Sequence, residues 1–184
     1  LKGKMGYRAY TTSDIVNKGE GALAFSPSNI SASGVSKINN NTYISWFKYD
    51  ESPELMVKNG YILLVKTGST YGKSMLVENL EEKATVNPQI LVIKPNGFNA
   101  KLLSIIISNR RFQRNIEQTV VGGAIPTISQ EKILKFKLLV PEPDEQQKIV
   151  DLLSSVDEKI TQVEAKKELL ERYKKGMMQK LFSK

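Results

Sequence analysis

The stretch IVDLLSSVDEKITQVEAKKELLERYKKGMMQKL, residues 149–181, decides how the chain is organised. One column of positions recurs in it at steps of four and three, and eight of its ten members are apolar. The column consists of Ile149, Leu153, Val156, Ile160, Val163, Lys167, Leu170, Lys174, Met177 and Leu181. This spacing is typical of a coiled-coil seam. It predicts one long helix that pairs with another helix through its apolar positions.

The predicted helix is long for a chain of 184 residues. Neither Gly nor Pro interrupts the run before Gly176, and at 1.5 Å per residue the helix extends over roughly 55 Å. The helix can pack on its own domain near its start, but its distal half needs a partner. Lys167 and Lys174 are unfavourable in the seam unless their stems reach solvent or the partner supplies carboxylates. Such polar interruptions often set the register and the choice of partner.

The first 98 residues contain short apolar and aromatic runs that predict a β-rich domain. Clusters of Gly, Asn, Ser and Pro separate the runs, and Asn39–Asn41 and Asn59-Gly60 are typical turn sequences. The predicted strands are Tyr7–Tyr10, Tyr43–Tyr49, Tyr61–Lys66, Ser74–Glu78 and Gln89–Lys94.

Residues 99–118 change to helical spacing. Asn99 is a suitable N-cap, and the apolar residues after it recur every three or four positions as far as Phe112. The pattern predicts a single helix, with Arg110, Arg111 and Arg114 on its other side.

The chain between this helix and the long one is predicted to hold a short helix and a last strand. Gly122–Pro126 is predicted to interrupt the regular secondary structure. Ser129 is predicted to cap a helix that ends at Leu134, and Phe136–Val140 is predicted to form a strand.

The boundary before the long helix lies near Pro143, where Asp144 and Gln147 are spaced as an N-capping pair. The expected fold is α+β. A β-rich domain with a few helices occupies residues 1–143, and a long coiled-coil helix, here called the arm, occupies residues 144–184.

The composition excludes most catalytic chemistry. The chain has no histidine, which removes the commonest general base and the commonest transition-metal ligand, and no cysteine for a disulfide or a thiolate site. No apolar run is long enough to span a bilayer. The net charge of +8 favours a polyanionic partner, although a lysine-rich solubilising surface would give the same value.

The loop Gly68-Ser69-Thr70-Tyr71-Gly72-Lys73 has the composition of a phosphate-binding loop but not its spacing. Three residues separate its glycines, whereas the P-loop needs four, and the segment that follows reads as a strand rather than a helix. Two interpretations remain: a tight turn between strands, or a DNA-contacting loop that uses Ser69, Thr70, Tyr71 and Lys73.

The three arginines of residues 99–118 also allow two interpretations. They can form an ordinary solvated helix face, or they can neutralise phosphates, which would make binding depend on salt. No pair of carboxylates has a setting that suggests acid–base catalysis, so we expect no catalytic residue, no metal and no cofactor.

From Gly122 to its C-terminus the chain resembles the specificity subunits of Type I restriction-modification systems. The similarity covers about 60 residues, and residues 12–15, 68–73 and 87–89 fall where recognition domains of this family carry similar elements. The motifs that carry it read Gly122-Gly123-Ala124-Ile125-Pro126, Ile128-Ser129, Leu138-Leu139-Val140-Pro141, Glu145-Gln146-Gln147-Lys148-Ile149, Asp157-Glu158-Lys159-Ile160 and the ending from Arg172 to Phe182.

The resemblance implies a prokaryotic, cytoplasmic subunit that reads DNA and has no catalysis of its own. In that family each recognition domain reads half of a bipartite target in duplex DNA. The long helices hold two such domains apart and dock the methyltransferase subunits, which work with a restriction subunit that translocates and cuts DNA.

With one recognition domain and one long helix, the chain is expected to be a C-terminal fragment or a half-size subunit. If it is half-size, two copies can pair their arms antiparallel as a homodimer and read a symmetric target. The alternative is a coiled-coil interaction adaptor whose basic charge is incidental.

Overall fold

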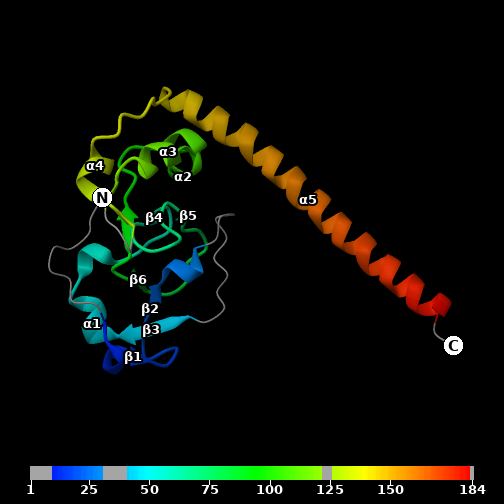
Figure 1. The fold of residues 1–184 in the computed structure, drawn as a ribbon, viewed down its shortest axis with the longest axis horizontal. Coiled ribbons are helices and arrows are strands. Elements are labelled where there is room, and N and C mark those ends of the chain that lie inside the picture. Colours follow the sequence, from blue (N-terminus) through cyan, green and yellow to red (C-terminus); the bar gives the residue numbers. More distant parts are fainter. Residues whose placement is uncertain (1–9, 31–40, 122–125, 183–184) are drawn as a thin grey trace. The chain divides into compact units, whose positions relative to one another are not determined.

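The computed structural model describes residues 10–30, 41–121 and 126–182. The chain divides into two compact units, residues 1–139 and residues 140–184 (Figure 1). Sheets and helices are both present, as the α+β prediction requires.

A mixed four-stranded sheet forms one layer of the first unit. Its strands are β1 (Ile15–Val16), β3 (Thr42–Ser45), β2 (Gly21–Phe25) and β6 (Ala84–Val86), in that order across the sheet. The pairs β1–β3 and β2–β3 are antiparallel, whereas β2 and β6 are parallel.

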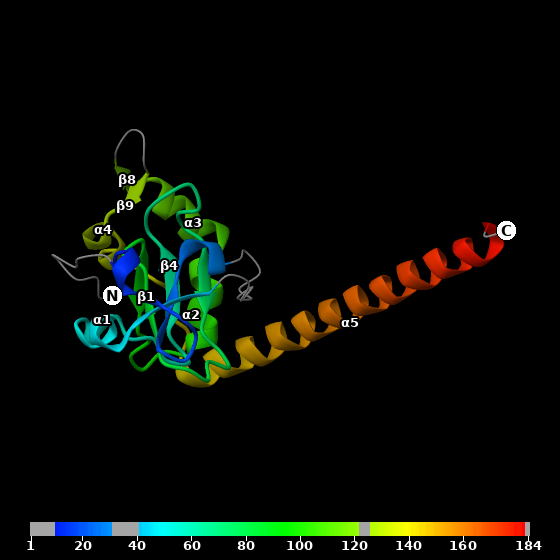
Figure 2. The ribbon, with the colours of Figure 1, turned by 90° about the horizontal axis from the view of Figure 1, so that it is seen from below.

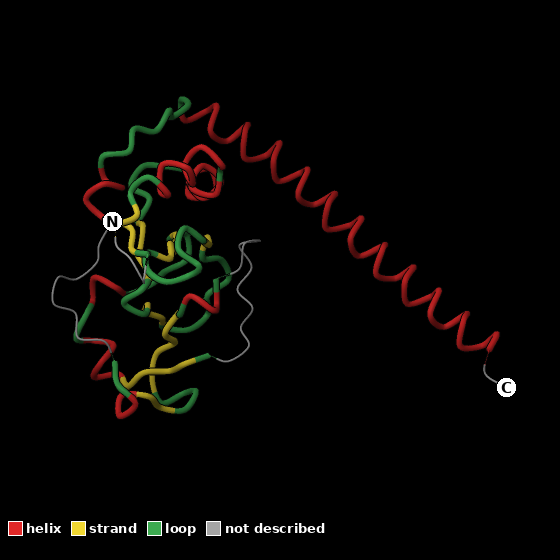
Figure 3. Tube along the Cα trace, in the orientation of Figure 1, coloured by secondary structure: helices red, strands yellow, loops and turns green. Residues whose placement is uncertain are grey.

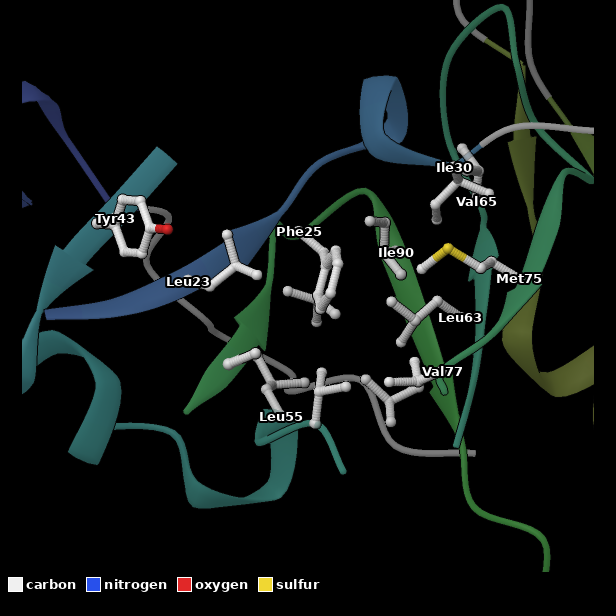
Figure 4. Close-up of a cluster of buried hydrophobic side chains, with 14 residues drawn as sticks. Leu23, Phe25, Ile30, Tyr43, Leu55, Leu63, Val65, Met75, Val77 and Ile90 are labelled. Atoms are coloured by element: carbon white, nitrogen blue, oxygen red, sulfur yellow. The ribbon is translucent and has the colours of Figure 1, made fainter. Parts of the chain in front are cut away.

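A three-stranded antiparallel sheet forms the next layer, with β4 (Ile62–Val65) between β5 (Ser74–Leu76) and β7 (Ile90–Ile93). Because side chains alternate along a strand, β4 serves two cores. Leu63 and Val65 face the cluster between the two sheets, here called the sheet cluster (Figure 4). Ile62 and Leu64 face a second cluster under the helices, here called the helix cluster. This two-sided burial explains why the strand is an unbroken apolar run.

The third layer consists of helices over the helix cluster. Its main elements are α2 (Ala100–Ser108), α3 (Arg110–Glu117) and α4 (Gln130–Leu134), with the hairpin β8 (Val120–Val121) and β9 (Thr127–Ile128) between α3 and α4. Each of the three helices contributes buried side chains to the cluster, as does β9. These side chains are Leu103, Ile107, Phe112, Ile116, Ile128 and Ile133.

Four short helical elements precede or connect the described strands of the first unit. They are the 3-10 turns η1 (Thr12–Asp14), η2 (Pro27–Asn29) and η3 (Pro53–Leu55) and the α-helix α1 (Trp46–Asp50).

The second unit is dominated by α5 (Pro143–Phe182), one helix of 40 residues without an interruption (Figure 3). The predicted arm is therefore confirmed as a single helix. Most of its apolar seam positions, from Val156 onward, are exposed.

Two predicted elements end earlier than the sequence suggested. The strand predicted over Tyr43–Tyr49 stops at Ser45, whose hydroxyl accepts a hydrogen bond from the Lys48 amide and caps α1. The single helix predicted over residues 99–118 is broken at Asn109, whose ψ of 143° is extended and whose side chain caps α3. In both cases a local side-chain cap competes with the regular element.

The predictions near the domain boundary also need correction. Phe136–Val140 forms no strand. Phe136 and Leu138 pack against the helix cluster, but no strand in the described part of the chain pairs with this segment. The long helix begins at Pro143, so Asp144 already lies inside its first turn and is not a cap.

Several expected elements are confirmed, and a few lie outside the described residues. The strands at β4, β5 and β7, the turn at Asn59-Gly60 and the Ser129 cap are present. The strand predicted over Tyr7–Tyr10, the Asn39–Asn41 turn and the Gly122–Pro126 break lie largely outside the described residues. Five strands in the described part of the chain were not predicted: β1, β2, β6, β8 and β9.

Candidate nucleic-acid interface

The loop between β4 and β5, residues 66–73, is closed by its own backbone. The Val65 amide donates to the Lys73 carbonyl, and the Gly72 amide donates to the Val65 carbonyl, both at 2.9 Å. Gly68 and Gly72 have φ values of +102° and +84°, which only glycine adopts without strain. Because β5 follows directly, the loop joins two strands, whereas a P-loop opens a helix.

The hairpin strand β9 holds the other side of the loop (Figure 2). The Ile128 amide donates to the Lys66 carbonyl at 2.8 Å, and the Gly68 amide donates to the Pro126 carbonyl at 3.2 Å. Thr67 and Thr127 form an antiparallel bridge between the two segments. The loop is thus fixed in place by a segment 60 residues later in the sequence.

Gln113 of α3 joins the loop to the helical layer. Its side-chain amide donates to the Gly72 carbonyl at 3.0 Å and to the Ile107 carbonyl at 2.7 Å. A Cβ atom on Gly72 would lie 2.6 Å from the Gln113 Oε1 atom, so the loop and the helix are in close contact at a glycine. Nothing in the sequence singles out Gln113, because a glutamine between two arginines carries no distinctive signal.

The three arginines lie on the outer face of α3. Phe112 and Ile116 are buried on the inner face, whereas Arg110, Arg111 and Arg114 are exposed. In the described part of the chain, no carboxylate lies within 4.0 Å of any of the three guanidinium groups. Their positive charge is therefore available to an anionic partner.

The predicted loop residues differ in how available they are. Ser69 and Lys73 are exposed, and Thr70 is half-buried. Tyr71 packs its ring against the helix cluster, so much of it contributes to the core. The structure places the loop and α3 side by side.

Lys66, which no sequence motif singles out, adds a cationic group at the base of the loop. Burial lowers the pKa of its amino group, because a partly desolvated ammonium is less stable than one in water. Its backbone is held by Gln89 and Ile128, so the side chain starts from a fixed point.

No metal centre or membrane span is found within the described residues. No group of three or more His, Cys, Asp or Glu side chains is placed to hold an ion. None of the helices in that part of the chain is long and apolar enough to cross a bilayer.

The family described as the Type I restriction modification DNA specificity domain matches residues 6–172. A putative Type I restriction enzyme MjaX specificity subunit from Methanocaldococcus jannaschii is 27% identical over 147 residues. These residues represent 77% of this chain and 35% of that protein.

Two further relatives are similar in extent. The Type I restriction enzyme MjaVIII specificity subunit of the same organism is 24% identical over 136 residues, or 71% of this chain and 32% of the relative. The Type I restriction enzyme HindI specificity subunit of Haemophilus influenzae is 28% identical over 109 residues, which represent 56% of this chain and 24% of that relative. The chain therefore spans about a third or less of the length of these relatives.

Proposed function

Because the chain belongs to the Type I restriction modification DNA specificity domain family, we propose that its first unit reads one half of a bipartite target in duplex DNA. In this role it has no catalysis of its own and acts in the cytoplasm with methyltransferase subunits and a restriction subunit. The names of the relatives, all specificity subunits, support this role.

The observation that carries the proposal is the fixed position of the 66–73 loop beside the exposed arginines of α3. Phosphate contacts orient a protein on DNA, whereas base-edge contacts give sequence specificity. We assign the phosphate contacts to Arg110, Arg111 and Arg114. We assign base-edge contacts to the loop residues Ser69, Thr70, Tyr71 and Lys73, among which Ser69 and Lys73 are the most exposed.

The net charge of +8 agrees with a DNA partner, because clustered cations attract phosphates over several ångströms. In a major groove, a lysine can donate to guanine acceptors and a serine hydroxyl can serve as donor or acceptor. A loop tied to β9 and α3 loses little further entropy on binding, which favours affinity.

The arm is proposed to pair with a second helix through its seam. Val156, Ile160, Val163 and Leu170 are between 45% and 66% exposed in the single chain, an unfavourable arrangement for four large apolar side chains at heptad spacing. A second copy of the chain would bury them and give a homodimer with two recognition domains and a symmetric target. The arms are also the proposed docking site for the methyltransferase subunits.

DNA binding is tested by fluorescence anisotropy with labelled duplex at several salt concentrations, with and without the methyltransferase subunits. We expect binding that weakens as salt rises. No salt-sensitive binding under either condition would contradict the proposal and favour a coiled-coil interaction adaptor.

Arm pairing is tested by light scattering on Val156→Lys and Val163→Lys variants. Each substitution places a charge in the seam, so we expect the mass to fall toward that of one chain. Ala165→Lys is the matched control, because residue 165 lies on the opposite side of the helix. An unchanged mass in both seam variants would contradict arm pairing.

A further inference from the structure

The sequence contains two Asn-Gly pairs, Asn59-Gly60 and Asn96-Gly97. At such a pair asparagine loses its side-chain amide most readily, because glycine has no Cβ atom to hinder the attack of its own backbone nitrogen. Both asparagines are exposed, and both glycines have a positive φ, +83° at Gly60 and +71° at Gly97. The two pairs are alike in sequence, exposure and backbone conformation, so any difference between them comes from their hydrogen bonds.

Deamidation joins two groups of neighbouring residues. The glycine nitrogen loses its proton and attacks the Cγ atom of the asparagine side chain. The new C–N bond closes a five-membered succinimide ring, and the side-chain nitrogen leaves as ammonia. Water then opens the ring at either carbonyl and gives aspartate or isoaspartate. The net reaction consumes one water and releases one ammonia, and it requires that both the glycine nitrogen and the asparagine side chain are free to move.

At Asn59-Gly60 both reacting groups are held by hydrogen bonds. The Oδ1 atom of Asn59 accepts from the Leu80 amide at 2.8 Å, and its Nδ2 atom donates to the Leu80 carbonyl at 3.1 Å. The Gly60 amide donates to the Val77 carbonyl at 2.8 Å. All three bonds must break before the succinimide can form, so the folded turn protects Asn59.

At Asn96-Gly97 both reacting groups are free. The pair lies in the loop between β7 and α2, residues 94–99. In the described part of the chain, neither the Asn96 side chain nor the Gly97 amide has a hydrogen-bond partner. Gly97 is exposed, and a Cβ atom built on it would meet nothing within 4 Å. The folded loop therefore leaves the nitrogen and the side chain open to solvent and to each other.

We propose that Asn96 is a site of spontaneous deamidation in the folded protein, with water as the only co-reactant, whereas Asn59 is protected. The proposal follows from the hydrogen bonds of the two pairs. It goes beyond the proposed DNA reading and does not depend on it.

Deamidation of Asn96 changes the charge of the loop and, in one product, the length of its main chain. Both products add a carboxylate and lower the net charge of +8 by one. An aspartate close to the start of α2 is favourable, because a helix N-terminus carries a partial positive charge. Isoaspartate instead inserts a methylene group into the main chain. Phe98, which packs against the helix cluster, and Asn99, which caps α2, follow directly, so isoaspartate should disturb the start of α2.

Peptide mass spectrometry on the full chain, incubated at mildly alkaline pH, tests the proposal. The tryptic peptides 59–66 and 84–101 report the two sites separately, because trypsin does not cleave between Lys94 and Pro95. Fragment spectra distinguish Asn96 from the other asparagines of its peptide. We expect Asn96 to convert about a hundredfold faster than Asn59, since each of the three hydrogen bonds at Asn59-Gly60 contributes a factor of about five. Equal rates in the folded chain would overturn the proposal.

Unfolding the chain in concentrated urea is the control for structure. The hydrogen bonds of Asn59-Gly60 are then absent, so both asparagines should convert at similar rates. Asn96 should convert at nearly the same rate in the folded and the unfolded chain. A much slower reaction of Asn96 in the folded chain would overturn the proposal, because it would show that the loop holds the reacting groups apart.

Two variants test the assignment to Asn96. The repair enzyme that methylates isoaspartyl residues serves as the probe for isoaspartate in the incubated chain. Asn96→Gln should abolish most of the signal, because glutamine would have to close a larger ring and reacts slowly. Asn59→Gln is the matched control and should leave the signal unchanged, since Asn96 reacts whether or not the other turn is intact. A full signal in Asn96→Gln would place the reaction elsewhere and contradict the proposal.

Discussion

The side-chain amide of Gln113 donates to the backbone carbonyl of Gly72 at 3.0 Å and thereby ties the arginine helix to the β4–β5 loop. The same amide donates to the carbonyl of Ile107 in the last turn of α2. One side chain therefore couples two features. It holds the candidate DNA-reading loop, and it holds the end of α2 at the break between α2 and α3.

Replacing Gln113 by alanine should loosen the loop without removing a charge. Two partly buried carbonyls lose their donor, so we expect a loss of about 1–2 kcal/mol in the free energy of unfolding. DNA binding should weaken as well, because the loop must then be ordered on binding. Urea unfolding and anisotropy measure the two effects, with exposed Gln118→Ala as the control. Reduced stability with unchanged DNA affinity would contradict a role of the loop in DNA binding.

Gly72→Ala and Gly60→Ala should differ in cost although both glycines have nearly the same φ, +84° and +83°. Each alanine adopts a left-handed conformation, which costs about 1 kcal/mol. At Gly60 the new Cβ meets nothing within 4 Å, whereas at Gly72 it meets Gln113. We expect Gly72→Ala to cost about 1 kcal/mol more in urea unfolding. Equal costs would mean that the glutamine moves aside freely.

The arginines of α3 should each contribute to the salt dependence of DNA binding. Removing one phosphate contact lowers the slope of log K against log salt by about 0.9. We expect this change for alanine at Arg110, Arg111 or Arg114, measured by anisotropy between low and moderate salt. Lys18→Ala, in the exposed turn between β1 and β2, is the control. An unaltered slope in all three arginine variants would remove α3 from the interface.

Asp14 should make stability depend on pH in the acid range. Its carboxylate accepts hydrogen bonds from the backbone amide of Thr11 at 2.7 Å and from the Thr11 hydroxyl at 3.0 Å, which lowers its pKa. Since the folded pKa lies below the ordinary value of 3.8, the stabilisation is complete above that pH and is lost as pH falls through the folded pKa. Thermal unfolding of Asp14→Asn should therefore differ from the unchanged chain near neutral pH and converge with it in acid. A constant difference at every pH would contradict this linkage.

Gly176→Ala should strengthen the arm. The glycine lies inside α5, and a Cβ there would meet nothing within 4 Å. Alanine should therefore stabilise the helix locally by about 1 kcal/mol. Circular dichroism of the full chain should show the helical signal of the arm persisting to higher temperature. A loss of helical signal would indicate that the position has another role.

The elements predicted correctly are those with a strong periodic signal. The ten-position seam identified α5, and the apolar runs at residues 62–65 and 90–93 identified β4 and β7, which are buried on both faces. Strand β2 was missed because GALAF is rich in glycine and alanine, which have weak β preference. Strand β6 was missed because ATV is only three residues long, too short for a periodic signal.

The residue types of the candidate site could be predicted from the sequence, but the contacts that position them could not. Ser69, Lys73 and the arginines could be listed from their chemistry. The link through Gln113 and the support from β9 depend on contacts between residues more than 40 positions apart, which no local pattern encodes. Tyr71 shows the converse limit, because no local pattern revealed that this residue also packs against the helix cluster.

The double-sided burial of β4 determines where this protein can change during evolution. A shift of β4 by one residue would exchange the side chains that face the sheet cluster and the helix cluster. We therefore expect an insertion within Ile62–Val65 to prevent folding. The 66–73 loop that follows β4 is held at its ends by β4, β5 and β9, whatever residues its tip contains. In the proposed role of the loop as a DNA reader, a new target sequence would require changes only at the loop tip, while the scaffold beneath it stays unchanged.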